Sequence, residues 1–327
     1  MAKPAFIITL DTEGDNLWES GPLITTQNTR FLPRFQALCE KYSFKPVWLT
    51  NYEMATDDAY IEFAQDVIAR QTGEIGMHLH AWNSPPLKAL TADDDRFQPY
   101  LIEYPDDVMK EKINVMTSLL EDKLQTKMLS HRAGRWAFNE KYARLLAEFG
   151  YQTDCSVTPR VNWAYTPGAP VPIGNGGTNY LNFPSEAYFM DLNDIRRPGD
   201  SALLQVPMSV QFRHSPLMNG LKQFYDKLRG KKRSPSVNWL RPKGGNLAQM
   251  QQVVDACLAQ GNSHIEFMLH SSEFMPGGSP TFRDEAAIDA LYDDLEQLFA
   301  YIAQRAEGMT LAEFYQRKLA QRHGSLS

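Results

Sequence analysis

Seven short apolar segments alternate with amphipathic segments along this 327-residue chain, and this alternation constrains the fold more than any other feature. Each apolar segment has the length of a buried strand, and most segments between them carry apolar residues at helical spacing. The strand-like segments lie at about 5–10, 46–50, 75–79, 128–130, 151–154, 202–207 and 264–269. The helix-like segments lie at about 29–42, 57–71, 106–124, 139–149, 217–229, 246–260, 284–304 and 310–320.

Alternating strands and helices predict a parallel sheet, because parallel neighbours are joined by crossover connections that are usually helical. The length of the chain favours a barrel over an open sheet, since α/β barrels run near 250 residues plus insertions. We expect one domain over 1–327, with no linker or internal repeat and with C-terminal helices between 284 and 320. Residues 159–201 are rich in Pro, Gly and Asn, which predicts a loop insertion with a short hairpin.

Polar residues gather at the carboxyl ends of the predicted strands, where the mouth of a parallel barrel lies. Asp11 and Glu13 follow the first strand, and His78 and His80 end the third. Arg132 follows the fourth strand, and Asp154 and His270 end the fifth and the seventh. Polar residues with purely structural roles would not be expected to recur at the carboxyl ends of the strands. We therefore predict that these side chains share one site.

The two histidines of the third strand are the principal metal-ligand candidates. Strand side chains alternate between faces, so His78 and His80 point to the same side. Two imidazoles and one carboxylate leave coordination positions open, which is the pattern of a catalytic divalent metal. Of the two acids after the first strand, one could complete the ligand set and the other could serve as general base.

The remaining candidates suit acid–base chemistry and substrate contact. His270 could act as general acid, because imidazole titrates near neutral pH. Arg132 could orient an acid through a bidentate pair. Aromatic side chains near a polar site suit stacking on sugar rings. The candidates for substrate contact are Trp82, Trp136, Trp163 and Asp154.

Composition narrows the partners and the compartment. A net charge of −6 and a pI near 5.7 argue against nucleic acid, because neutralising phosphates needs a basic surface. Three distant cysteines predict no disulfide framework and favour a reducing compartment. With no signal peptide or membrane-spanning run recognised, we expect a cytoplasmic protein. The basic run 227–233 would suit a phosphate- or lipid-linked sugar.

Four segments, in order along the chain, resemble the motifs of the polysaccharide deacetylases of carbohydrate esterase family four, which include chitin and peptidoglycan deacetylases. Thr9–Glu13 resembles a variant of the acid-bearing first motif, with one residue between the acids. Glu74–His78 is similar to the start of the metal-histidine motif, His131–Trp136 to the arginine-bearing motif, and Leu269–Ser271 to the last motif. The resemblance covers about residues 5–275 and implies a distorted (β/α)7 barrel with a divalent metal, often Zn²⁺.

Position by position, the resemblance also implies a division of roles. Asp11 would be the general base, positioned by Arg132, and His270 would protonate the leaving amine. Glu13 and His78 would bind the metal.

Two positions depart from the family pattern. The second metal histidine is expected four residues after His78, where this chain has Trp82, and we assign His80 in its place. Glu13 stands where the family usually has a metal-binding aspartate.

The expected activity is therefore metal-dependent hydrolysis of an N-acetyl group on an acetylated amino sugar or polysaccharide intermediate. Glycoside hydrolysis by two acids, Asp11 with Glu273 or Asp154, is a second hypothesis. A carbohydrate-binding protein that keeps the barrel without a metal is a third, because one barrel fold hosts many functions.

Overall fold

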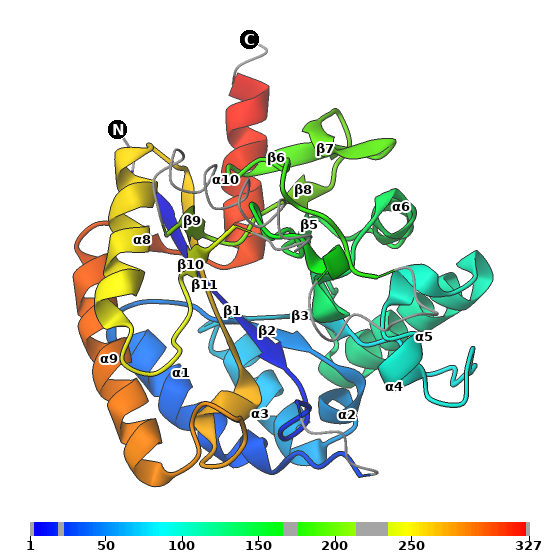
Figure 1. The fold of residues 1–327 in the computed structure, drawn as a ribbon, viewed down its shortest axis with the longest axis horizontal. Coiled ribbons are helices and arrows are strands. Elements are labelled where there is room, and N and C mark those ends of the chain that lie inside the picture. The colour runs from blue at the N-terminus through cyan, green and yellow to red at the C-terminus, as the bar shows by residue number, and fades with distance from the viewer. Residues whose placement is uncertain (1–2, 19–22, 166–175, 214–234, 325–327) are drawn as a thin grey trace, which may run out of the picture.

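The computed structural model describes residues 3–18, 23–165, 176–213 and 235–324. Seven parallel strands form one curled sheet in the order β11–β1–β2–β3–β4–β5–β8 (Figure 1). This arrangement confirms the predicted distorted (β/α)7 barrel. The strands are β1 (Ala5–Thr12), β2 (Val47–Thr50), β3 (Glu74–Leu79), β4 (Ser130–Ala133), β5 (Thr153–Asp154), β8 (Leu204–Gln205) and β11 (His264–His270).

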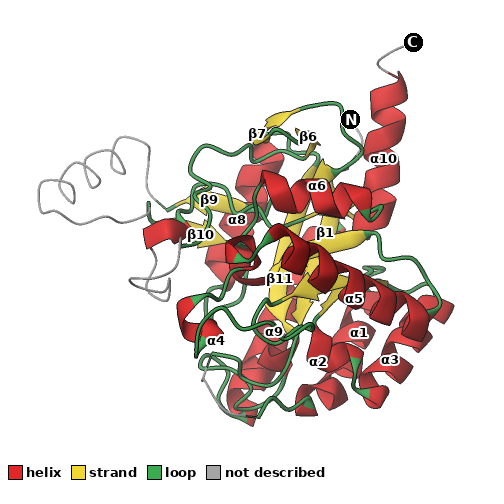
Figure 2. Cartoon of the chain, turned by 90° about the vertical axis from the view of Figure 1, so that its right-hand side faces the viewer, coloured by secondary structure: helices red, strands yellow, loops and turns green. Residues whose placement is uncertain are grey.

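Helices surround the sheet, which lies at the centre of the molecule (Figure 2). They are α1 (Leu32–Lys41), α2 (Tyr52–Ala55), α3 (Asp58–Ala69), α4 (Asp94–Phe97), α5 (Asp106–Leu124), α6 (Glu140–Glu148), α8 (Leu247–Ala259), α9 (Glu285–Ala303) and α10 (Leu311–Gly324). Asn139 caps α6 by accepting a hydrogen bond from the Tyr142 amide, as its sequence position predicted. The helix predicted near 217–229 lies outside the described residues. Among the described helices, none combines the length and apolarity needed to cross a bilayer.

The barrel is incomplete between β8 and β11, which do not pair with each other in the described parts of the chain. Ser209 accepts a hydrogen bond from the Glu266 amide (2.9 Å) and Leu240 accepts one from the Met268 amide (3.4 Å), so two loop segments cover this gap. Strand β9 (Val210–Phe212) directly follows Ser209, and strand β10 (Val237–Trp239) directly precedes Leu240. These two strands pair antiparallel.

The insertion predicted over 159–201 contains the expected hairpin. Its strands are β6 (Tyr188–Asp191) and β7 (Asp194–Pro198), and β6 pairs antiparallel with β8. At the other side of the sheet, β12 (Glu307–Gly308) pairs with the start of β1.

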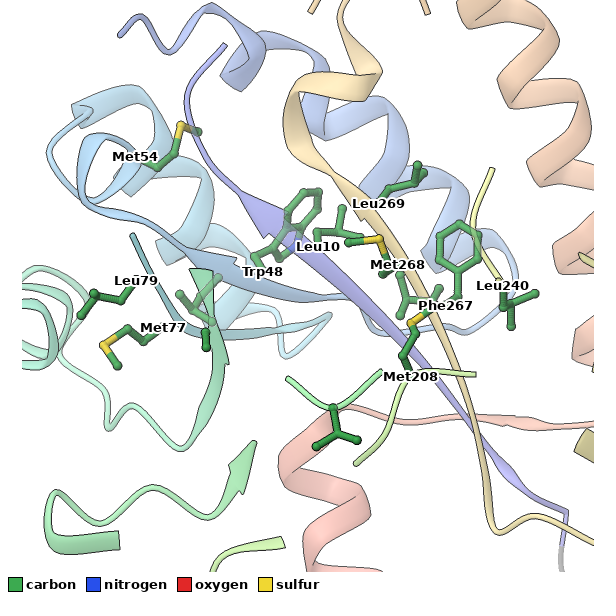
Figure 3. Packing of buried hydrophobic residues seen from close by; sticks show 14 of the residues in the cluster. Leu10, Trp48, Met54, Met77, Leu79, Met208, Leu240, Phe267, Met268 and Leu269 are labelled. Atoms are coloured by element: carbon green, nitrogen blue, oxygen red, sulfur yellow. The ribbon is translucent and has the colours of Figure 1, made fainter. Parts of the chain in front are cut away.

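Residues of β1 alternate between two hydrophobic clusters, as strand geometry requires. Phe6 and Leu10 belong to the large cluster between the sheet and its surrounding helices, part of which Figure 3 shows. Ile7 belongs to a second cluster inside the barrel, to which α10 contributes Leu311 and Phe314. The backbone amide of Ala312 in α10 also donates a hydrogen bond to the carboxylate of Glu74, the first residue of β3. Helix α10 therefore fills the amino-terminal end of the barrel, away from the strand ends that carry the polar candidates.

The fourth strand lies later in the chain than predicted, because β4 runs over Ser130–Ala133 and includes two polar residues. His131 and Arg132 are fully buried, and both find partners that offset their desolvation. Strand β3 can pack closely here because a Cβ on Gly76 would lie only 2.6 Å from the Ser130 carbonyl oxygen. Arg132 is thus part of a strand and does not follow one.

Candidate active site

The strand register brings the predicted polar residues together in two pairs. Asp11 of β1 lies opposite His270 of β11, and His78 of β3 lies opposite Arg132 of β4. Strands β1 and β3 are both neighbours of β2, so these pairs end at the same edge of the sheet. Parallel pairing therefore collects residues that are far apart in sequence at one mouth.

Glu13, His78 and His80 place three potential metal ligands within reach of one another. The two Nε2 atoms of the histidines are 3.0 Å apart, and Oε2 of Glu13 lies 3.1 Å from His80 Nε2 and 3.7 Å from His78 Nε2. Ligands held about 2.0–2.1 Å from a tetrahedral zinc ion are separated by about 3.3 Å, so these spacings fit a metal centre.

The hydrogen bonding of His78 also fits metal binding. Its Nδ1 lies 2.9 Å from the Arg132 carbonyl oxygen, which can only accept, so Nδ1 carries a proton. In the neutral imidazole, the Nε2 lone pair then faces His80 and Glu13. Burial raises the pKa of Glu13, but the charge of His270 and the contacts with His78 and His80 outweigh it and hold that pKa well below its usual value. A buried carboxylate and two imidazoles are a donor set suited to Zn²⁺.

Arg132 holds Asp11 from behind the site. Its guanidinium is fully buried, and Nη1 donates to Asp11 Oδ1 at 2.7 Å. Nη2 donates to Thr9 (2.6 Å) and to Glu266, and Nε donates to the Cys155 carbonyl oxygen (3.3 Å). Every nitrogen of the fork is engaged, which fixes the Asp11 carboxylate in one orientation.

The free oxygen of Asp11 faces the metal ligands and His270. Its Oδ2 lies 4.0 Å from His78 Nε2 and 3.8 Å from His270 Nε2. Burial raises the pKa of Asp11, but Arg132, His78 and His270 together outweigh it and hold the pKa below its usual value. Asp11 is therefore a carboxylate at neutral pH, with one oxygen anchored and one directed into the site.

His270 is oriented by a carboxylate on its own turn. Glu273 accepts hydrogen bonds from the His270 amide (2.9 Å) and from its ring Nδ1 (3.0 Å). Arg241 donates to the same Glu273 oxygen at 3.1 Å. This arrangement directs His270 Nε2 towards Asp11 and Glu13, at 3.8 and 3.9 Å.

A pocket of about 480 Å³ opens above these groups. Its walls are aromatic: Trp136 and Trp163 both pack edge-to-face on Trp239, and Trp18 packs edge-to-face on His270. The lining residues are Asp11, Glu13, Leu17, Trp18, His78, His80, Trp82, Tyr100, Arg135, Trp136, Trp163, Arg241 and His270. Five of the six tryptophans in the chain thus line this pocket or support its wall. Such walls suit the apolar faces of sugar rings.

The turn after β4 is strained. Arg135 (φ 51°, ψ 29°) and Trp136 (φ 60°) both adopt left-handed backbone conformations, which cost about 1–3 kcal/mol each for residues other than glycine. Trp136 gains from stacking under the Arg132 guanidinium, 4.7 Å from the ring centre. Arg135 pairs with Asp95 (2.6 Å), but a partly exposed ion pair returns only about 0–1 kcal/mol.

Most predicted site residues meet at this pocket, but Asp154 does not line it. The Asp154 carboxylate is fully buried, and it bonds to His131 Nδ1 (2.8 Å) and to Ser156. Its position at the end of β5 turns it towards β4 and not towards the mouth. Arg132, which bonds to Asp11, is likewise absent from the lining.

Sequence reasoning missed several residues of the site. Glu266 braces Arg132 and Arg241 braces Glu273, while Trp18 and Tyr100 complete the walls. The position of Glu266 could have been recognised from the sequence, because an acid inside an apolar strand requires a buried partner. The others come from loops, whose position the spacing of apolar residues does not fix.

Comparison with solved structures identifies the fold. A protein described as a polysaccharide deacetylase from Mycobacterium smegmatis matches with a TM-score of 0.57 and 14% identity, over 98% of this chain and 95% of its own. A protein described as a glycoside hydrolase/deacetylase from Parabacteroides distasonis matches with a TM-score of 0.61 and 11% identity, over 97% and 72%. A GH57 branching enzyme from Thermococcus kodakaraensis matches with a TM-score of 0.54 and 10% identity, over 96% and 71%.

Sequence comparison adds nothing to this, since no family model and no curated protein matches the chain. The likeness to solved structures extends over nearly the whole chain. The chain therefore has the fold of the polysaccharide deacetylases, as its four motif-like segments predicted.

Proposed function

We propose that this chain is a metal-dependent hydrolase that removes the N-acetyl group from an acetylated amino sugar. The observation that carries the proposal is the convergence of three ligand atoms, 3.0–3.7 Å apart, beside an oriented carboxylate and an oriented imidazole. Hydrolysis of an amide needs carbonyl polarisation, a base for water and an acid for the departing amine. The pocket offers a group for each requirement.

Glu13, His78 and His80 would hold the divalent cation, and their ligand types favour Zn²⁺. When bound there, the cation would supply Lewis-acid polarisation of the acetyl carbonyl and a lower pKa for the attacking water. His80 would take the place of the histidine that the family pattern expects at the position of Trp82. Its Nε2 supports this assignment, because it lies within 3.1 Å of both partner ligand atoms.

Asp11 would act as the general base. Its Oδ2 is unshared with Arg132, faces the ligand atoms and belongs to a carboxylate that is ionised at neutral pH. Arg132 would serve as a positioning residue, because it fixes the other oxygen and stabilises the ionised form.

His270 would act as the general acid. Its Nδ1 is held by Glu273, so the opposite nitrogen, Nε2, is directed into the pocket. A proton on Nε2 could pass to the nitrogen of the departing amine and thereby prevent reversal of the cleavage. The carboxylate of Glu273 would stabilise the protonated ring during that transfer.

The test is acetate release from N-acetylated sugar oligomers by zinc-loaded protein. Asp11→Asn should reduce kcat by about 10²- to 10⁴-fold, since it removes the base while preserving size and hydrogen bonding to Arg132. Asp66→Asn is the matched control, because Asp66 is an exposed acid that pairs with Arg70. Unchanged acetate release by Asp11→Asn, or release that survives a chelator, would overturn the proposal.

The likeness to a branching enzyme supports the glycoside-hydrolase hypothesis, but the positions of the acids in the site oppose it. Neither acid proposed as partner of Asp11 lines the pocket. Glu273 is 1% exposed and bonds to His270 and Arg241, and Asp154 is fully buried beside His131. Release of reducing ends without acetate would select this alternative.

A further inference from the structure

We propose that Arg135 recognises an anionic group, a carboxylate or a phosphate, on the acetylated sugar. This inference rests on the proposed deacetylation and names the class of its substrate. It assigns the charged side chain of the pocket that the chemistry leaves without a role.

Arg135 is fixed beside the metal-ligand set. It follows Gly134, which packs so closely on the end of β3 that a Cβ there would lie 2.5 Å from the Leu79 carbonyl oxygen. The same Cβ would lie 3.1 Å from the Cα and from the ring of His80. A side chain that leaves this turn into the pocket therefore starts next to His80, within the reach of a sugar whose acetyl group is at the ligands.

The other two arginines of the site are occupied. Arg132 is fully buried and its fork is engaged by Asp11, Thr9, Glu266 and the backbone. Arg241 donates to Glu273 and contacts the ring of His270.

Arg135 differs from both. Its side chain is 32% exposed, and only Nη2 has a hydrogen-bond acceptor in the described chain, which is Asp95. Nε and Nη1 are left to bind a planar oxyanion in the geometry that guanidinium groups prefer.

The charges around the pocket favour an anionic ligand. Two acids, Asp11 and Glu13, and two arginines, Arg135 and Arg241, are among the lining residues. Asp95 and Glu273, the acidic partners of these two arginines, lie outside the lining. A divalent cation held by the ligand set would offset the charges of Asp11 and Glu13, so these acids would no longer repel an anionic ligand at Arg135.

The ion pair with Asp95 shows that the Arg135 guanidinium binds a carboxylate in this position. It lies on α4, and it also lines a smaller neighbouring pocket of about 280 Å³ whose wall includes Trp82. A substrate carboxylate would bind beside Asp95 or replace it at the guanidinium. Removal of the Asp95 charge should therefore strengthen binding of an anionic sugar, whereas removal of Arg135 should weaken it.

The experiment compares sugars that differ only in charge. N-acetylglucosamine, its C6 carboxylate, its 6-phosphate and its 1-phosphate are offered to zinc-loaded protein, and kcat/KM is measured from acetate release. Binding of the same four compounds is measured by calorimetry. We expect at least one anionic sugar to be preferred over the neutral one, and the preferred sugar distinguishes carboxylate from phosphate recognition.

Arg135→Gln should lower the ratio of anionic to neutral kcat/KM by about 10- to 100-fold, the range for losing a charge-assisted hydrogen bond. Arg196→Gln is the matched control and should keep the ratio, because Arg196 pairs with Asp194 on the hairpin of β6 and β7. Asp95→Asn should raise the ratio. This second variant keeps the inference testable if Arg135→Gln fails to fold.

Equal rates and equal binding for all four sugars would overturn the inference, as would a preference that Arg135→Gln leaves intact. Failure of the proposed function looks different, because no sugar would then release acetate. In that case the calorimetric preference and its response to Arg135→Gln still decide whether Arg135 binds anions.

Discussion

Replacing Arg132 by methionine should damage both stability and catalysis, because this fully buried guanidinium neutralises two buried acids. Arg132→Met leaves Asp11 and Glu266 without their cation, and it removes the donors to Thr9 and to a backbone carbonyl. Breaking a buried ion pair by removing one partner costs about 3–5 kcal/mol. That is a large share of the roughly 5–15 kcal/mol by which a folded protein is stable.

Urea unfolding of wild type and Arg132→Met measures this loss. The double variant Arg132→Met with Glu266→Gln should recover about 1–3 kcal/mol, because it removes one of the two buried acids that have lost their partner. Arg132→Lys keeps a charge but not the fork, so it should fall between wild type and Arg132→Met.

The pH profile of kcat/KM separates the structural from the positioning role. Burial raises the pKa of Asp11. Among the charges that lower this pKa, that of Arg132 has the largest effect. Without the arginine, the pKa of Asp11 rises, so the acidic limb of the profile should move to higher pH in Arg132→Met. Arg132→Lys should leave that limb nearer to wild type. A loss below 1 kcal/mol, together with an unmoved acidic limb, would refute this reasoning.

Three further outcomes follow from the same geometry. His270→Gln should lower kcat by about 10²- to 10⁴-fold while zinc content, measured by mass spectrometry, stays at the wild-type level. Trp163→Ala should raise KM about 3- to 10-fold for a sugar oligomer, the range for losing one aromatic contact. Burial raises the pKa of Glu266 to about 7, so the folded state holds a proton that the unfolded chain releases from about pH 4.5. Its contribution to stability should therefore fall by up to about 3 kcal/mol as the pH rises from 4.5 to 7, and Glu266→Gln should remove that slope in urea unfolding.

The longer strands, such as β1 and β11, were accessible from the sequence because they contain apolar runs, whereas β4 was placed too early because it contains His131 and Arg132. The acids, histidines and arginine near the carboxyl ends of the strands could be located as well. The carboxyl ends of parallel strands lie at the same edge of the sheet, so residues at these ends lie close together. His80 illustrates this most clearly. Spacing on one strand face predicted its place beside His78, although the family pattern pointed to the position of Trp82.

Other parts of the site depend on packing that spacing does not encode. Asp154 ends a predicted strand like the other candidates, but β5 is only two residues long and its acid turns to His131. Arg241 enters from a loop beside the gap between β8 and β11, which a closed barrel would not have. The left-handed turn at Arg135 lacks the glycine that would have revealed it.

Zinc titration of metal-free protein by calorimetry tests the central claim most directly. The geometry of Glu13, His78 and His80 predicts one zinc ion per chain. His80→Ala should weaken binding by at least about 100-fold, more than the loss of a residue that only supports a ligand, whereas Trp82→Phe should change it only slightly. Absence of zinc uptake by the wild type, or equal affinity in His80→Ala, would contradict the account.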